Sequence, residues 1–128
     1  MTAQVKTVLA LLIGMVVYSV GLSVLHAQTK APGAYWVVET LEISDQAAFL
    51  KAVQAVPPTL QPFGGRYIVL GGKIAPHNGP PPGRIAIVAF DSLDKAQQWI
   101  SNPAAMAARA EVEKHAKSRS YVLEGVAN

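Results

Sequence analysis

The sequence predicts an α+β domain with four strands and two main helices in the order β-α-β-β-α-β. Three observations predict this order. Segments rich in aromatic and β-branched residues recur at 35–43, 66–70, 84–90 and 120–126. Apolar residues at helical spacing follow the first and third of these segments. Stretches rich in proline and glycine separate the elements. This order is the split βαβ pattern of ferredoxin-like folds, whose antiparallel four-stranded sheet carries both helices on one face.

The N-terminal residues stand apart from this domain. Lys6 precedes nineteen uncharged residues, and Ala27 follows at a position suited to signal peptidase. We expect a signal peptide over residues 1–27 and a periplasmic or secreted protein. The alternative is an N-terminal anchor with the domain facing outward, because about 18 apolar residues already span a bilayer. Residues 28–34 are expected to be a linker, and residues 35–128 the domain.

Composition excludes several classes of function. The chain has no cysteine, so it has no disulfide, no thiol chemistry and no cysteine metal site. Its formal net charge is +3, and the basic residues are scattered rather than clustered into the stripe that marks a nucleic-acid surface. No G-x-S-x-G turn is present, so nucleophilic catalysis is not indicated. We expect no nucleic-acid partner and no cofactor.

The first half of the domain is expected to run strand, helix, strand. In the strand 35–43, Tyr35, Val37 and Glu39 share one face, and Trp36 and Val38 share the other. A helix over 44–56 ends at two prolines, and a short helical piece over 58–63 follows. The glycine pair 64–65 then lets the chain enter the strand 66–70. These glycines follow a helix rather than a strand, so they do not predict a phosphate-binding loop.

The second half repeats the pattern. A loop over 73–83 holds four prolines and two glycines, and the strand 84–90 follows it. A helix over 91–102 is capped by Ser92, an alanine-rich helix over 104–116 follows Pro103, and the strand 120–126 closes the domain. We expect a homodimer, because two helices cannot cover all the apolar strand residues. That set is Trp36, Val38, Ile68, Leu70, Ile85, Ile87, Tyr121 and Leu123.

Three strings resemble the domain of unknown function 1330 family, a branch of the dimeric α/β-barrel superfamily. They are "VPPTLQPFGGRYIVLGG", "GRIAIVAFDSLDKAQQWISNP" and "AKSRSYVLEGV", and the resemblance covers roughly residues 34–126. It implies a ferredoxin-like monomer, two copies of which join their sheets into a barrel, and it implies no established reaction. The chain departs from the family pattern at Ala89, where a glutamate is usual, at Ala105, where an aromatic residue is usual, and at Val112, where an arginine is usual. Arg109, one turn earlier, is expected to replace that arginine in part. The loop "APHNGPPPG" also differs.

Several residues are candidates for a site. Tyr67 and Trp99 line a pocket or belong to the core. Arg84 binds an anionic ligand together with Arg66, or the two arginines cap strand ends and pair with acids. Glu39 is a buried general base with a raised pKa, or it faces solvent or the dimer seam and pairs with a basic residue such as Arg66 or Arg84.

The two histidines of the domain do not predict a metal site. His77 and His115 lie on a loop and a helix without the i, i+4 spacing that places two ligands on one metal ion. His115 is better explained as a surface residue near a helix C-terminus, where a cation is favoured.

Two functions follow as hypotheses. The first is an exported homodimeric α/β-barrel protein that binds a small apolar or aromatic ligand, with Tyr67, Arg84 and Trp99 as the binding residues, or that acts structurally. The alternative is a cofactor-free oxygenase or isomerase acting on a small aromatic substrate, with Glu39 or His115 as base and Arg84 as electrostatic stabiliser.

Overall fold

The computed structural model describes residues 32–127. The predicted signal peptide or anchor over 1–27, and residues 28–31 of the predicted linker, lie outside the described residues. Within residues 32–127, no helix is both long and apolar enough to cross a bilayer. Residues Pro32–Val126 form one compact unit.

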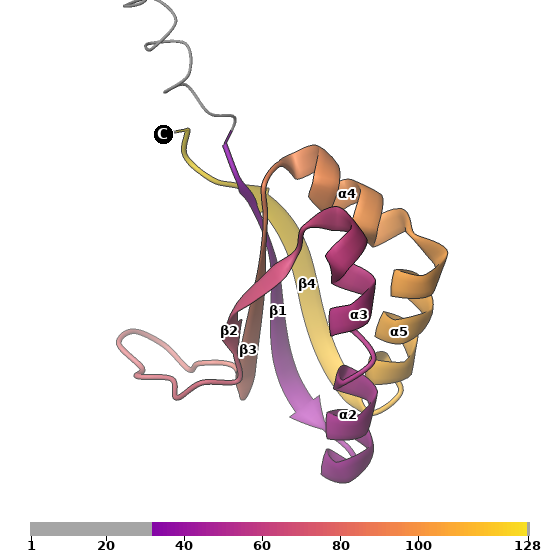
Figure 1. The fold of residues 1–128 in the computed structure, drawn as a ribbon. Coiled ribbons are helices and arrows are strands. Elements are labelled where there is room, and N and C mark those ends of the chain that lie inside the picture. The colour runs from indigo at the N-terminus through magenta and orange to yellow at the C-terminus, as the bar shows by residue number, and fades with distance from the viewer. Residues whose placement is uncertain (1–31, 128) are drawn as a thin grey trace, which may run out of the picture. The chain divides into compact units, whose positions relative to one another are not determined.

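Four antiparallel strands form the sheet, in the spatial order β2-β3-β1-β4. Their bounds are β1 Ala34–Ile43, β2 Arg66–Leu70, β3 Arg84–Phe90 and β4 Ala116–Glu124. Figure 1 shows the helices on one side of this sheet and the other side open. The predicted ferredoxin-like fold is therefore confirmed.

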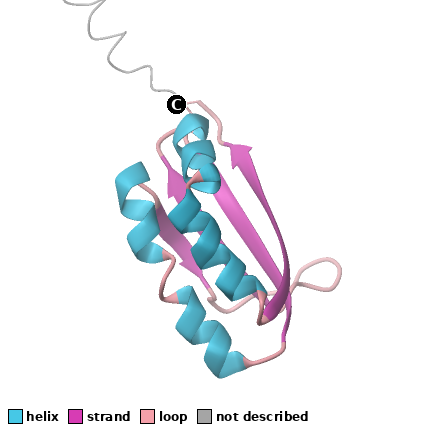
Figure 2. Ribbon diagram, turned by 90° about the vertical axis from the view of Figure 1, so that its right-hand side faces the viewer, coloured by secondary structure: helices cyan, strands magenta, loops and turns pink. Residues whose placement is uncertain are grey.

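The short helical segments form two groups that cross the covered face of the sheet, as Figure 2 shows. After β1 come α2 Gln46–Val53, α3 Pro57–Leu60 and the 3-10 turn η1 Gln61–Phe63; after β3 come α4 Leu93–Ser101 and α5 Pro103–Glu113. Side chains of Asp45, Ser92 and Asn102 cap α2, α4 and α5 by accepting backbone N–H groups. Gly64 follows η1 with a φ of 69°, so the expected left-handed exit into β2 is confirmed.

The boundary between α5 and β4 differs from the prediction. The helix was expected to reach residue 116 and the strand to begin at 120, but α5 ends at Glu113 and β4 begins at Ala116. Pairing with β1 overrides the weak helical preference of this polar segment, because Ala116 lies opposite Ile43 and Lys117 opposite Glu42. A bulge between Thr40 and Glu42 accommodates the register.

The core lies between the sheet and the helices and is centred on Trp99 of α4, which is fully buried. Its ring meets Trp36 edge-on, with centroids 4.8 Å apart, and lies 5.7 Å from Phe90. Its indole N–H donates to the Thr59 hydroxyl at 3.0 Å, which ties α4 to α3. One aromatic residue thus joins both strand-following helical segments to the sheet.

The uncovered face of the sheet is apolar but differs in membership from the prediction. Trp36 and Val38 are not on it, because they point toward the helices, where Trp36 is only 7% exposed. The registers β1 to β3 and β1 to β4 place Val37, Ile87 and Tyr121 together on the open side. Exposed large apolar residues of the strands are Leu41, Ile68, Val69, Leu70, Tyr121 and Leu123. Of these, Leu70 is also not on the open face, because it lies opposite Ala86, on the side of Val38 and the helices.

Candidate functional site

A pocket opens between the sheet and the helices, at the end of the domain where α2 and the start of β3 lie. Its cavity volume is about 50 Å³. That is room for a few water molecules, at roughly 10–15 Å³ each. It is small beside the roughly 300 Å³ or more of typical ligand pockets. A ligand of aromatic size would therefore extend through the open mouth. Apolar side chains form most of the wall, including Trp36, Val38, Phe49, Val53, Val56, Leu70, Ala86 and Val112.

Arg84 extends from the first position of β3 to the mouth of this pocket. Its guanidinium carbon lies 5.5 Å from the centroid of the Phe49 ring of α2, a cation–π arrangement. Gly71 gives it room, since a Cβ built there would overlap the Arg84 guanidinium. Gly71 also has a φ of 63°, which an L side chain rarely adopts. The first glycine of the second pair thus leaves room for the Arg84 side chain.

Arg109 of α5 contributes a second guanidinium to the same pocket. Its Nη2 donates to the Ile100 carbonyl at 2.6 Å, and its guanidinium lies 4.6 Å from the centroid of the Trp99 ring. Its Nη1 is buried and has no hydrogen-bond partner among the described residues. Burial lowers the pKa of Arg109, and the charge of Glu113 opposes that effect.

Two further ionisable groups line the pocket, Tyr67 of β2 and Glu113 of α5. Burial raises the pKa of the Tyr67 phenol, although the positive charge of Arg84 acts in the opposite direction. Tyr67 therefore presents a neutral hydroxyl at physiological pH. Arg109, Val112 and Glu113 are spaced at i, i+3 and i+4, which places them on one face of α5. This spacing is the sequence signal from which the α5 side of the pocket could have been predicted.

The structure brings together two of the three predicted binding residues. Tyr67 and Arg84 line the pocket, whereas Trp99 is not among its lining residues. Trp99 lies behind the wall, in contact with Trp36 and under the Arg109 guanidinium. Its position matches the core alternative that the sequence left open.

The predicted clamp of Arg66 with Arg84 is wrong. β2 and β3 pair antiparallel, with Arg66 opposite Ala89 and Leu70 opposite Ala86, so the first residues of the two strands lie at opposite ends of the pair. Arg66 instead lies 3.7 Å from Asp91 in an exposed ion pair. The second arginine of the pocket comes from α5.

Glu39 lies on the open face of the sheet, and the proposal that it is a base with a raised pKa is wrong. Arg119, its partner across β4, donates through Nε at 2.8 Å and through Nη2 at 3.2 Å, and the Tyr121 hydroxyl donates at 3.2 Å. Hydrogen bonding by Arg119 is the main reason that the pKa of Glu39 is lowered. The alternative prediction, that Glu39 faces away from the core and pairs with a basic residue, is confirmed, but the partner is Arg119 rather than Arg66 or Arg84, because the strand register places Arg119 opposite it.

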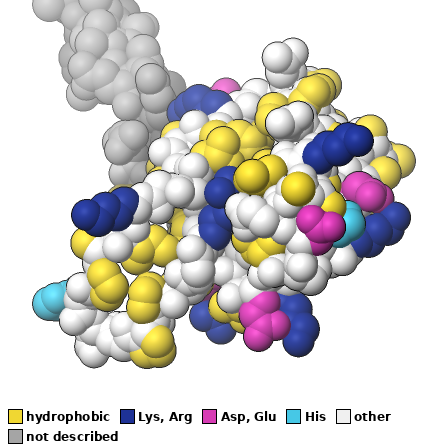
Figure 3. Space-filling model, turned by 90° about the horizontal axis from the view of Figure 1, so that it is seen from below, with side chains coloured by type: hydrophobic (Ala, Val, Ile, Leu, Met, Phe, Trp, Pro, Cys, Tyr) yellow, Lys and Arg dark blue, Asp and Glu magenta, His cyan; other side chains and the backbone are white. Residues whose placement is uncertain are grey.

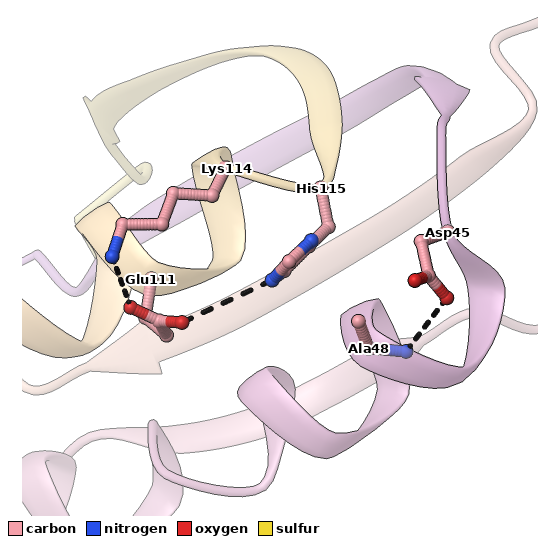
Figure 4. A network of polar contacts seen from close by, with 5 residues as sticks. All are labelled: Asp45, Ala48, Glu111, Lys114 and His115. Carbon is pink, nitrogen blue, oxygen red and sulfur yellow. Dashed lines mark hydrogen bonds and ion pairs between the residues drawn. The ribbon is translucent and has the colours of Figure 1, made fainter.

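The histidines also lie outside the pocket lining. His115 follows α5, and its Nε2 is 3.9 Å from Glu111, a carboxylate that also accepts from Lys114 at 2.7 Å; Figure 4 shows this surface network beside the Asp45 cap. His77 is exposed on the loop. Among residues 32–127, no three His, Cys, Asp or Glu side chains are grouped to hold a metal ion.

The face seen from below carries basic, acidic and hydrophobic side chains in a mixture, with no continuous basic stripe on the described surface in that view (Figure 3). This distribution is unlike the clustered positive charge of nucleic-acid interfaces.

Solved structures confirm the fold. SnoaB, a cofactor-independent oxygenase from Streptomyces nogalater, is 12% identical, with a TM-score of 0.56 over 73% of this chain and 92% of its own. A putative antibiotic biosynthesis monooxygenase from Nitrosomonas europaea is 14% identical, with a TM-score of 0.54 over 76% of this chain and 92% of its own. A dimeric ferredoxin-like protein of unknown function from Thermobifida fusca is 15% identical, with a TM-score of 0.54 over 73% of this chain and 92% of its own.

At such identities the likeness establishes the architecture and no activity. No curated protein matches the chain in sequence. The profile of one family, the domain of unknown function DUF1330, matches residues 33–126, which is nearly all of the compact domain. The chain therefore belongs to the DUF1330 family.

Proposed function

We propose that this protein is an exported homodimer that binds a small apolar or aromatic ligand in the pocket between sheet and helices. The observation that carries the proposal is the composition of the pocket wall. A concave apolar surface is built by β1, α2 and α5, and a few polar groups converge on it. In a purely structural domain, well-packed side chains would be expected to fill this space.

The homodimer is proposed from the open face of the sheet. Val69 is 36% exposed, Tyr121 46% and Leu123 44%, and they lie on one continuous surface of four strands with Val37 and Ile87. A second copy would remove this surface from water. The similar protein from Thermobifida fusca is itself described as dimeric.

Native mass spectrometry of the protein purified from its own host tests these points in one experiment. We expect a dimer mass with one retained organic molecule per protomer. A dimer without any bound molecule contradicts ligand binding and favours a structural role, and a monomer at micromolar concentration contradicts the dimer. A protomer mass equal to that of a chain starting at Gln28 supports export with cleavage. A protomer mass equal to that of a chain with residues 1–27 supports the anchored alternative.

A cofactor-free oxygenase or isomerase is the second candidate, and the shared fold of SnoaB is the observation that favours it. The predicted general bases of this enzyme, Glu39 and His115, do not fit the pocket. Neither Glu39 nor His115 lines the pocket, whereas Glu113 does. Binding is better supported, since it needs only the wall and the polar groups already present. Oxygen uptake with aromatic substrates that is abolished by Glu113→Gln would favour the enzyme.

A further inference from the structure

Two guanidinium groups from different elements line one small pocket, and both lack an acidic partner within ion-pair distance in the described part of the chain. We propose that the ligand of this pocket carries a single negative charge of the carboxylate type, and that Arg84 and Arg109 bind it. The inference rests on the proposed function, because it names the class of the molecule that the pocket takes.

Arg109 provides the first argument. Its Nη2 donates to the Ile100 carbonyl, and its guanidinium lies over the Trp99 ring. These two contacts hold the guanidinium in one position. Its Nη1 is buried without an acceptor in residues 32–127, and Arg109 is one of the residues that line the pocket. Leaving a buried donor unpaired is costly, and a charged donor more so. An acceptor atom of a ligand in the pocket would satisfy it.

Arg84 provides the second argument. Its side chain does not extend freely into water but lies along the Phe49 ring, in the space that Gly71 leaves open. Such stacking orients the planar fork and reduces the entropy lost when an anion binds. The positive charge of Arg84 also acts on the Tyr67 hydroxyl, which supplies a neutral donor at the same wall.

The charge of the wall indicates how many negative charges the ligand has. Glu113 is the one acidic residue among the lining side chains, against Arg84 and Arg109. The excess is one positive charge, which a monoanion neutralises and a dianion exceeds. The remaining wall is mostly apolar, with Thr40, Tyr67, Ser118 and Ser120 as its neutral polar residues, so most of the rest of the ligand is apolar as well. A carboxylate with an aromatic or aliphatic body combines these properties.

A matched pair of probes tests the inference on the full-length protein. Phenylacetate and 2-phenylethanol have the same ring and a similar length, but only the first is charged at pH 7. Titration calorimetry, together with the fluorescence of Trp36 and Trp99, measures both affinities. We expect phenylacetate to bind about tenfold to a hundredfold more tightly, the range of one or two charge-assisted hydrogen bonds.

Variants then assign the effect to the two arginines. Arg84→Met and Arg109→Met should each weaken phenylacetate about tenfold or more and change the alcohol by less than about twofold. Arg66→Met is the matched control, because Arg66 is an arginine of the same sheet that lies outside the pocket lining. It should leave both affinities unchanged. If loss of the stack on Trp99 unfolds Arg109→Met, Arg109→Lys keeps the charge, loses the planar fork, and should still weaken phenylacetate.

The outcomes separate the two proposals. Equal affinity for the acid and the alcohol overturns the charged-ligand inference and leaves the apolar pocket intact. Tighter acid binding that persists in both Arg84→Met and Arg109→Met also overturns it. If neither probe binds at about 10 mM while the protein is folded by circular dichroism, the proposed ligand-binding function is contradicted together with this inference.

Discussion

Replacement of Thr59 by valine removes the acceptor of the buried Trp99 indole N–H while keeping the shape of the side chain. Trp99 is 0% exposed, and the bond from Nε1 to the Thr59 hydroxyl is 3.0 Å long. The hydroxyl also donates to the Val56 carbonyl at 2.6 Å, but that carbonyl keeps the Thr59 backbone N–H at 3.0 Å. The indole N–H is therefore the only group of this set that Thr59→Val leaves without a partner.

An unpaired buried donor costs about 1–3 kcal/mol. We therefore expect Thr59→Val to lower the free energy of unfolding by about 2 kcal/mol. Thr59→Ser is the matched control, because it keeps the hydroxyl and loses one methyl group, worth at most about 0.8 kcal/mol when fully buried. Thr59 is only partly buried, so the serine variant should lose less than that.

Urea denaturation of the full-length protein, followed by far-UV circular dichroism, measures both variants. The protomer concentration is held constant, because association with a second copy contributes to apparent stability. If Thr59→Val is no more destabilising than Thr59→Ser, the hydrogen bond to Trp99 does not stabilise the join between α3 and α4, and the reasoning fails.

Three further predictions concern the sheet and the helix caps. Glu39→Gln should lower the thermal stability of the protein at pH 7. This loss relative to the unchanged protein should disappear as the pH falls below about 4.5, because the pKa of Glu39 is lowered in the fold and its carboxylate stabilises the fold only while it is charged. A loss that grows in acid, measured by thermal unfolding, contradicts this. Asn102→Ala should cost about 1 kcal/mol in denaturant unfolding, since its Oδ1 accepts the Ala105 N–H at 3.1 Å, and Asn102→Asp should largely retain stability; equal losses would count against the cap. Leu123→Lys should halve the mass seen by analytical ultracentrifugation, whereas Met106→Lys, at a similarly exposed position on α5, should not; a dimer that survives Leu123→Lys shows that the open face is not the interface.

The order of the elements could be predicted from the sequence because local signals agree with the final structure. Alternating residues in β1, the glycine that ends η1, and the cap at Ser92 are all short-range features. The start of β4 could not be predicted in this way. Residues 116–119 have no strand pattern, and only pairing with the far end of β1 makes them extended.

The site was less predictable because its residues converge from distant parts of the chain. Tyr67 and Arg84 could be predicted as site residues from their positions in the strands. Arg109 could be predicted only as a partial replacement for a family arginine, since a helix sequence does not say which of its side chains will face a neighbouring strand. The partner of Glu39 required the register of β1 against β4, which no local pattern specifies.

The two ends of the described domain lie side by side, since the Gly125 N–H donates a hydrogen bond to the Gly33 carbonyl at 2.7 Å. This closeness makes the domain suited to circular permutation. A few residues inserted between Val126 and Pro32 would close the chain, and new ends could be placed in the exposed loop at His77 and Asn78. The strands would then follow one another along the chain in the order β3, β4, β1, β2, and no strand pairing of the sheet would be cut. A fluorophore or an affinity tag carried at the new ends would lie on the loop that joins Leu70 to Arg84, next to the residues that line the pocket.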